Sequence, residues 1–190
     1  MSALLDKKAD FTMNLLLDSA SELVQTMEVG EVSFKKVAEQ AEISQRTMFR
    51  YFRTRELFLD ALTEKLYREL DLPDVPEDVN LLPIYIEQLY KKLDAQPQKV
   101  MVLLSGDLFP RVLKTTAKQR LLSLKKLLSK AYPAANDELI TKTAANLRYV
   151  MSASSWRYYR MHFEFDLDAS IDCAKMLITQ ALRYLNEKSA

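Results

Sequence analysis

Apolar residues recur three and four positions apart along most of the chain, which is the spacing of one face of an α-helix. Two clear runs are Ile140, Ala144, Leu147 and Met151, and Ile171, Ala174, Ile178, Ala181 and Leu185. The alternation typical of a half-buried β-strand never persists. The pattern therefore predicts an all-α protein, with helices over residues 8–28, 34–40, 45–51, 55–71, 78–95, 97–105, 110–131, 137–163 and 168–187.

The prolines divide these helices into two groups. No proline precedes Pro73, and residues 70–83 contain three prolines together with four acidic residues. Because a proline disfavours the helical conformation of the residue before it, this segment predicts a boundary. We expect an N-terminal helical domain over residues 1–71 and a larger helical domain over residues 72–190.

Composition narrows the class of protein. The 190 residues are 48% hydrophobic and 28% charged with a net charge of +1, as in a soluble globular protein. Cys173 is the only cysteine, so we expect neither a disulfide framework nor a cysteine-rich metal site. The 2 glycines are too few for a glycine-rich phosphate loop. No apolar run reaches the roughly 18 residues of a membrane span, and the N-terminus lacks the order of a signal peptide. We therefore expect a cytoplasmic protein without a membrane partner.

The sequence SFKKVAEQAEISQRTMFRYF, residues 33–52, predicts two short helices around a tight turn. Ser33 and Ser44 can each cap a helix, since a serine oxygen accepts a hydrogen bond from a backbone N–H of the first turn. The second helix begins with Gln45, Arg46 and Thr47. Two short helices joined in this way form a helix-turn-helix.

Cationic residues gather on this helix pair in a chain of almost no net charge. Lys35, Lys36, Arg46, Arg50, Arg53 and Arg55 outnumber Glu39 and Glu42. One interpretation is a solvated basic face on an ordinary helix pair. The other, which we favour, is a DNA-binding surface, because the first residues of the second helix in such a motif meet base edges in the major groove. There Arg46 can donate two hydrogen bonds to a guanine, and Gln45 can pair with an adenine.

The order of residues from Ser33 to Phe58 resembles the DNA-binding domain of the tetracycline-repressor (TetR) family. The matching positions are Ser33, Val37–Ala38, Ala41–Ser44, Thr47–Phe52 and Arg55–Leu57, and the resemblance covers roughly residues 10–65. It implies binding to a double-stranded, pseudo-palindromic DNA operator. The candidate DNA contacts are Ser33, Lys35, Lys36, Ser44, Gln45, Arg46, Thr47, Phe49, Arg50, Tyr51 and Arg55.

Three positions depart from the family pattern. Glu42 replaces the usual glycine of the turn, so the turn is either strained or shaped differently. Phe49 replaces a tyrosine whose hydroxyl usually contacts phosphate, and a phenylalanine can pack but cannot donate. Arg55 replaces a phosphate-contacting lysine and preserves its charge.

The segment NLRYVMSASSWRYYRMHF, residues 146–163, is rich in aromatic and thioether side chains. Such side chains suit an adaptable apolar pocket, and a few polar groups would orient a ligand. The candidate ligand-binding residues are Leu103, Phe109, Leu147, Arg148, Met151, Ser155, Trp156 and Tyr159. The segment also suits a dimer face, because small residues allow a close approach of helices and aromatic residues anchor interfaces.

The family resemblance favours a dimer face, since the last two long helices of these proteins form a four-helix bundle across a two-fold axis. We expect residues 139–161 and 170–185 to form it here. The candidate interface residues are Ala144, Met151, Ser154, Tyr158, Met161, Ala174, Ile178 and Ala181.

Residues 111–130 contain seven lysines and arginines and no acidic residue. A helix of this kind can bind an anionic membrane surface or a second nucleic acid. We favour a core helix with solvated lysines, in which Leu113, Ala117, Leu121, Leu124 and Leu128 point inward.

The sequence does not favour an enzyme. A nucleophilic serine or cysteine needs a base, and His162 is the only histidine. A metal site needs several ligands together, which no spacing in the chain provides, and no cofactor is expected. The predicted function is a homodimeric repressor that a small hydrophobic or amphipathic effector releases from operator DNA. The alternative is a helical adaptor that binds a partner protein without sequence-specific DNA binding.

Overall fold

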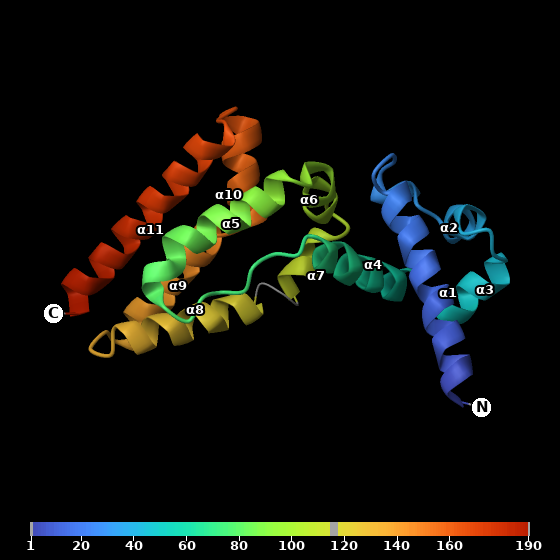
Figure 1. Cartoon of the computed structure of the whole chain (residues 1–190), viewed down its shortest axis with the longest axis horizontal. Helices are drawn as coiled ribbons and strands as arrows, with labels where there is room; N and C mark the ends of the chain where they lie inside the picture. The colour runs from blue at the N-terminus through green and yellow to red at the C-terminus, as the bar shows by residue number, and fades with distance from the viewer. Residues whose placement is uncertain (1, 115–117, 190) are drawn as a thin grey trace. The chain divides into compact units, whose positions relative to one another are not determined.

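The computed structural model describes residues 2–114 and 118–189, and the described residues form helices joined by turns, without a β-strand (Figure 1). The predicted all-α fold is confirmed. The chain forms two compact units. The first unit contains residues 1–69 and 101–112, and the second contains residues 70–100 and 113–190. Residues 101–112 thus pack with the N-terminal helices, whereas the division at residue 71 into a DNA-binding and an effector domain stays a prediction about function.

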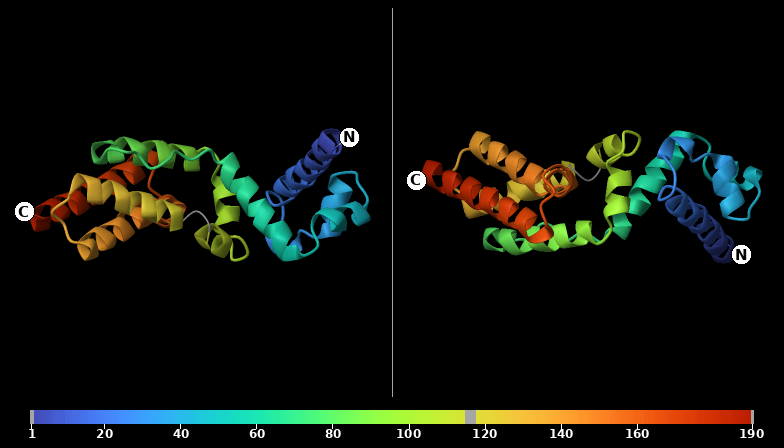
Figure 2. Two further views of the ribbon diagram at one scale, coloured as in Figure 1. Left: turned by 90° about the horizontal axis from the view of Figure 1, so that it is seen from below. Right: turned by 90° about the horizontal axis from the view of Figure 1, so that it is seen from above.

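The first unit is a small helical bundle. Its helices are α1 (Ser2–Leu23), the 3₁₀ turn η1 (Val29–Glu31), α2 (Phe34–Gln40), α3 (Gln45–Tyr51), α4 (Arg55–Glu69) and α7 (Phe109–Val112), with the end of α6 (Pro97–Leu103). Helix α2 packs against α3 and α1, and α4 packs against α1 and α7. Figure 2 shows the short helices α2 and α3 beside the longer α1. Leu16, Val37, Met48, Phe58 and Leu62 lie in the core of this unit with no exposed surface.

Among the described residues, the second unit is built around four longer helices. It contains η2 (Val79–Leu81), α5 (Leu82–Asp94), α8 (Lys118–Ala131), α9 (Asp137–Val150), α10 (Ala153–Arg157), the π-helical turn η4 (Tyr158–His162) and α11 (Leu167–Ser189). Helix α9 packs against α8 and α11, and α11 also packs against α5. Its core includes Tyr90, Leu147, Trp156 and Ile178, whose side chains are fully buried.

The helix predicted over residues 137–163 is interrupted. Helix α9 ends at Val150, and the next residue, Met151, has φ −87° and ψ 50°. Ser152 then caps α10, because its hydroxyl accepts a hydrogen bond from the backbone N–H of Ser155 at 3.3 Å. The prediction of one continuous helix was wrong because the apolar spacing continues across the break. The sequence does not distinguish a serine that caps a new helix from a serine inside a continuous one.

Other predicted helices also differ in their bounds, by one to several residues at an end. Helix α1 ends at Leu23, five residues before the predicted end at residue 28. The helix predicted over residues 110–131 is described as α7 and α8, and residues 115–117, including Ala117, lie outside the described residues.

The basic helix α8 has a clear buried side. Leu124, Leu127 and Leu128 are buried, whereas Leu122 is 59% exposed. The inward placement predicted for Leu124 and Leu128 is confirmed, but Leu113 is 41% exposed and was wrongly placed inward. None of the helices within the described ranges has the length and apolar content that crossing a membrane requires.

A carboxylate joins α5 to α11. Glu87 accepts a hydrogen bond from Lys175 of α11 at 2.8 Å and another from Lys91, one turn along α5, at 2.7 Å. The hydrogen bond from Lys175, followed by that from Lys91, lowers the pKa of Glu87 from 4.5 to about 2. Because the folded state holds the carboxylate in its charged form, this contact stabilises the fold above the unfolded pKa and is lost as the pH falls toward about 2.

We expect Glu87→Gln to lower the melting temperature at pH 7, and the difference from the unmodified protein to shrink between about pH 4.5 and pH 2. Thermal unfolding followed by circular dichroism across this range measures the effect. Lys91→Met is the matched control, because it removes the hydrogen bond within α5 and leaves the contact between helices. A difference that stays constant from pH 7 to pH 2 would assign the effect to packing.

Candidate nucleic-acid interface

Two serine caps set the ends of the helix-turn-helix. The hydroxyl of Ser33 accepts a hydrogen bond from the backbone N–H of Lys36 at 3.2 Å, and α2 begins at the next residue. The hydroxyl of Ser44 accepts a hydrogen bond from the backbone N–H of Thr47 at 3.2 Å, and α3 begins at Gln45, the residue after Ser44. Both predicted caps and the predicted bounds of both helices are confirmed.

The turn between the two helices keeps a left-handed residue although it lacks glycine. Glu42 has φ 54°, and its N–H donates to the carbonyl of Glu39 at 3.1 Å. The N–H of Ile43 donates to the carbonyl of Ala38 at 3.0 Å. This pair of hydrogen bonds is a Schellman motif, whose left-handed position usually holds glycine. Of the two alternatives for Glu42, the structure therefore selects a turn of the usual shape with a strained residue in it.

Buried side chains determine which side of α3 packs against the rest of the unit. Met48 has no exposed surface and Phe52 is 3% exposed. The ring of Phe52 contacts Phe58 of α4 edge-on, with ring centres 5.4 Å apart, and Phe34 of α2 contacts Phe58 at 5.6 Å. The ring of Phe49 packs edge-on against Phe34 at 5.2 Å but stays 52% exposed. These contacts hold one side of α3 against α2 and α4 and leave its other side to solvent.

The candidate DNA contacts on the outer side are exposed. Gln45 and Arg46, at the start of α3, are both exposed, and neither side chain has a hydrogen bond or ion pair to another described residue. Arg50 is also exposed and lies over the ring of Tyr51, 5.3 Å from its centre. Lys35 forms a 3.8 Å contact with Glu39 in which both side chains are largely exposed, so little energy holds it there. These side chains can reorient toward a phosphate or a base edge at little cost.

The structure assigns Arg55 a contact that the sequence did not predict. Its guanidinium donates hydrogen bonds to the carbonyls of Val29 and Val32 at 2.8 Å and to that of Gly30 at 3.4 Å. Arg55 therefore holds η1 against the start of α4. Its contact with phosphate stays a prediction.

A second unforeseen contact ties α7 to α4. The guanidinium of Arg111 donates to the carboxylates of Glu56 and Asp60, and its Nε donates to the carbonyl of Asp107 at 3.2 Å. The hydrogen bond to Glu56, and then that to Asp60, raises the pKa of Arg111. No local pattern indicates this clamp, because its partners lie 51 and 55 residues away in the chain.

This geometry agrees with comparison to known proteins. Residues 16–62 match the family described as bacterial regulatory proteins of the tetR family. The helix-turn-helix part of the chain, residues 16–62, thus belongs to the TetR family of DNA-binding domains. Proteins of this family are DNA-binding transcriptional regulators and not enzymes. Comparison of this regulator with curated protein sequences gives no match.

Solved structures share the fold of this TetR-family regulator at low sequence identity. A TetR-like transcriptional regulator from Rhodococcus sp. RHA1 is 16% identical, with a TM-score of 0.60 over 90% of this chain and 96% of that one. A single-residue variant of TetR from Acinetobacter baumannii AYE, in complex with minocycline, is 14% identical, with a TM-score of 0.55 over 92% and 96%. The dihydroxyacetone kinase operon activator DhaS is 14% identical, with a TM-score of 0.51 over 94% and 98%.

The candidate ligand-binding residues are distributed over both units. Leu103 and Phe109 belong to the first unit and the other six to the second. Trp156 is fully buried and donates a hydrogen bond to Asp94 at 3.2 Å, and Asp94 also accepts one from Arg160 at 2.7 Å. Ser155 is 4% exposed and lies 3.2 Å from the hydroxyl of Tyr90, whose pKa is raised by burial. Within the described residues, these groups hold the core of the second unit together, and their contact with a ligand stays a prediction.

Four candidate interface residues lie inside the second unit. Ala144, Ala174 and Ile178 have no exposed surface and Met151 is 4% exposed. These four side chains are covered by their own unit, and their assignment to a dimer face stays a prediction. These residues were identified by apolar side chains at helical spacing. That spacing is the same for a side chain buried inside its own unit and for one buried against a second copy.

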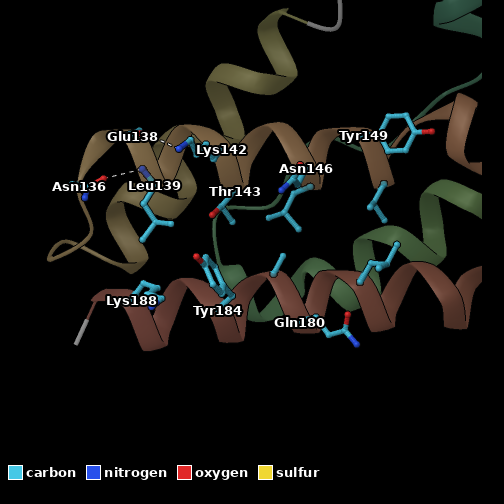
Figure 3. A pocket seen from close by; sticks show the side chains of 14 residues that line it. Asn136, Glu138, Leu139, Lys142, Thr143, Asn146, Tyr149, Gln180, Tyr184 and Lys188 are labelled. Carbon is cyan, nitrogen blue, oxygen red and sulfur yellow. Dashed lines mark hydrogen bonds and ion pairs between the residues drawn. The ribbon is translucent and has the colours of Figure 1, made fainter.

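The other four candidates lie around surface cavities on α9, α10 and α11. A groove of about 830 Å³ between α9 and α11 is lined by Leu139, Leu177, Ala181 and Tyr184 among others, and in Figure 3 Leu139 and Tyr184 point into the space between the two helices. Ser154, Tyr158 and Met161 line a cavity of about 430 Å³. Tyr149, 61% exposed, lines both cavities. We call this surface the α9–α11 face.

We expect Glu42→Gly to raise the free energy of unfolding by about 0.5–1 kcal/mol, because glycine relieves the left-handed strain at the cost of some chain entropy. Urea denaturation measures the change. Glu42→Ala is the matched control, since it removes the charge and keeps the strained side chain. Equal stabilisation by both substitutions would show that charge, and not backbone conformation, matters at this turn.

Proposed function

We propose that this TetR-family regulator is a homodimeric repressor that binds a pseudo-palindromic operator and is released by a small hydrophobic or amphipathic effector. The observation that carries the proposal is the pair of unpartnered side chains Gln45 and Arg46 on the outer side of α3, whose inner side is held by Met48. A rigid helix with donors at its first turn is what direct reading of base edges requires.

The two classes of contact have different tasks. Arg46 and Gln45 at the start of α3 would read bases in the major groove. Lys35, Lys36 and Arg50, all exposed, would contact phosphates and set the position of the helix on the duplex. Phosphate contacts carry most of the salt-dependent affinity and little of the sequence preference.

The α9–α11 face supports the proposed dimer. Tyr149 is 61% exposed, Tyr184 is 54% exposed and Leu177 is 37% exposed, although all three carry large apolar surfaces. Exposed apolar side chains gathered around a groove are typical of a protein interface. A second copy packed there by two-fold symmetry would cover them, and two α3 helices about 34 Å apart would then enter successive major grooves.

Repression and release follow from this arrangement. A dimer that covers two successive major grooves would exclude polymerase from a promoter. Among the structural neighbours, a TetR variant binds minocycline, which supports a small organic effector here. DhaS is described as an activator, so the fold by itself does not fix the direction of regulation.

Release requires that the effector favours one conformation over another. Helix α6 continues from the second unit into the first between residues 100 and 101, and α4 ends where the first unit ends. An effector that prefers a conformation in which α4 or α6 is tilted would change the spacing of the two α3 helices. Its effect on DNA affinity cannot exceed the difference between its affinities for the two conformations.

A gel shift with DNA from upstream of the gene tests the proposal against the helical-adaptor alternative. We expect retarded bands that unlabelled specific DNA removes and scrambled DNA does not. Absence of any sequence-specific band for a folded dimer would favour the adaptor.

We expect Arg46→Ala to lower affinity for the operator by about 1–3 kcal/mol and to relax base preference. Lys36→Ala, the matched control on α2, should weaken binding to operator and scrambled DNA alike. Titrations of both variants against both DNAs at fixed salt distinguish the two roles. Equal losses on operator and scrambled DNA for Arg46→Ala would remove it from base reading.

We expect Leu177→Arg to produce monomers with little affinity for the operator, because a charge in the groove opposes packing of a second copy and a monomer loses the second half-site. Analytical ultracentrifugation measures the assembly. Leu122→Arg on α8 is the matched control: this side chain is also exposed but does not line the α9–α11 face. A dimeric Leu177→Arg protein with normal operator binding would place the interface elsewhere.

A further inference from the structure

The first unit contains a cavity that no predicted site includes. It has a volume of about 490 Å³ and lies between the turn after α1, residues 27–30, and the segment that joins α6 to α7, residues 101–107. Met27, Val29, Met101 and Val102 supply apolar walls. Small-molecule sites in proteins commonly have volumes of roughly 300–1,000 Å³ and apolar walls with a few polar groups, and this cavity has both properties.

The charged groups that line the cavity are anionic. The carboxylates of Glu28 and Asp107 line the cavity, and neither has a hydrogen bond or ion pair to another described residue. The arginines nearby are occupied: Arg55 donates to the carbonyls of Val29 and Gly30, and Arg111 donates to Glu56 and Asp60. Among the described residues, no lysine, arginine or histidine lines the cavity. Lys36 contacts one of the lining residues from outside the cavity, since its Nζ lies 3.7 Å from Sδ of Met27.

A hydroxyl in the cavity wall lacks a partner. The side-chain oxygen of Ser105 is buried and has no hydrogen-bond partner among the described residues. A buried hydroxyl without a partner is costly, and such groups in folded proteins are nearly always satisfied by protein or water. A bound molecule with a donor group would satisfy it.

Both glycines of the chain line this one cavity. Neither has a positive φ, so no turn requires glycine at these positions. Crowding does not require it either: a Cβ on Gly30 would lie 3.9 Å from Oδ2 of Asp107, and a Cβ on Gly106 would have no neighbour within 4 Å. Leaving the cavity open is a role that accounts for both. The position of a Cβ on Gly30 also means that a larger side chain there would grow across the cavity toward Asp107.

We propose that this cavity binds a small organic cation, with an ammonium group between Glu28 and Asp107 and an apolar body on Met27, Met101 and Val102. The ammonium can also donate to the hydroxyl of Ser105. This site lies inside the unit that holds the helix-turn-helix and is distinct from the effector site predicted in residues 146–163. Because residues 27–30 and 101–107 lie far apart in the chain, an occupant bridges two segments and stabilises the unit in which they are packed together.

The test uses full-length protein and 4-phenylbutylamine as the probe, with 4-phenylbutanol and 4-phenylbutanoate as uncharged and anionic counterparts. Methyl NMR of ¹³C-methionine reports binding locally, since Met27 and Met101 line the cavity and Met176, exposed on α11, does not. We expect saturable shifts of Met27 and Met101 with the amine, at least about fivefold weaker binding of the alcohol, and none of the acid.

Variants separate charge from shape. Glu28→Gln and Asp107→Asn should each weaken amine binding by about threefold to fivefold, and Glu31→Gln, an exposed neighbour outside the cavity, should not. Gly30→Leu should abolish binding at an unchanged melting temperature, and the two charge variants carry the test if this substitution impairs folding. Equal binding of amine and alcohol, equal shifts at Met176, or full amine binding by the Glu28 and Asp107 variants would overturn the proposal.

Discussion

Helix α3 has only seven residues, and an isolated helix of that length does not persist in water. Its outward chemistry therefore depends on the burial of Met48 and on the ring contacts of Phe34 and Phe52 with Phe58. Those contacts fix the rotation of α3 about its own axis, and this rotation decides that Gln45 and Arg46 face solvent. The serine hydroxyls at the starts of α2 and α3 each accept a hydrogen bond from a backbone N–H that has no partner within its helix. These hydrogen bonds oppose fraying of the first turn of both helices.

Helix α4 extends this constraint to the rest of the first unit. Phe58 receives the aromatic contacts from α2 and α3, and Arg55 holds the carbonyls of η1. Arg111 of α7 binds Glu56 and Asp60 one turn apart on the same helix. The first two turns of α4 thus connect the recognition surface, the turn after α1 and a segment from much later in the chain. A displacement of residues 101–112 would act directly on α4, the helix against which α3 packs, through the contacts of Arg111.

The sequence was sufficient where the determining contacts are local. The caps at Ser33 and Ser44 join groups three residues apart, and the bounds of α2 and α3 followed from them. The sequence was insufficient where the determining contacts join residues that lie far apart in the chain. The partners of Arg111 lie more than fifty residues away, and the burial of Ala144 depends on which surface covers it. Glu42 is intermediate: its position in the turn was evident, but only φ selected the strained alternative. The sequence gives only one indication of the cavity beside Gly30 and Gly106: these are the 2 glycines of the chain.

The division of the chain into units has a consequence for how such a regulator can evolve. The chain passes from one unit to the other after residues 69, 100 and 112. A single genetic crossover near residue 70 would join a new C-terminal half to an N-terminal fragment without its own residues 101–112. That fragment would lose Arg111 and leave the carboxylates of Glu56 and Asp60 without it. Exchange of C-terminal halves between relatives therefore needs a donor that brings a compatible α6–α7 segment, so a division of the chain at residue 70 does not by itself give two exchangeable parts.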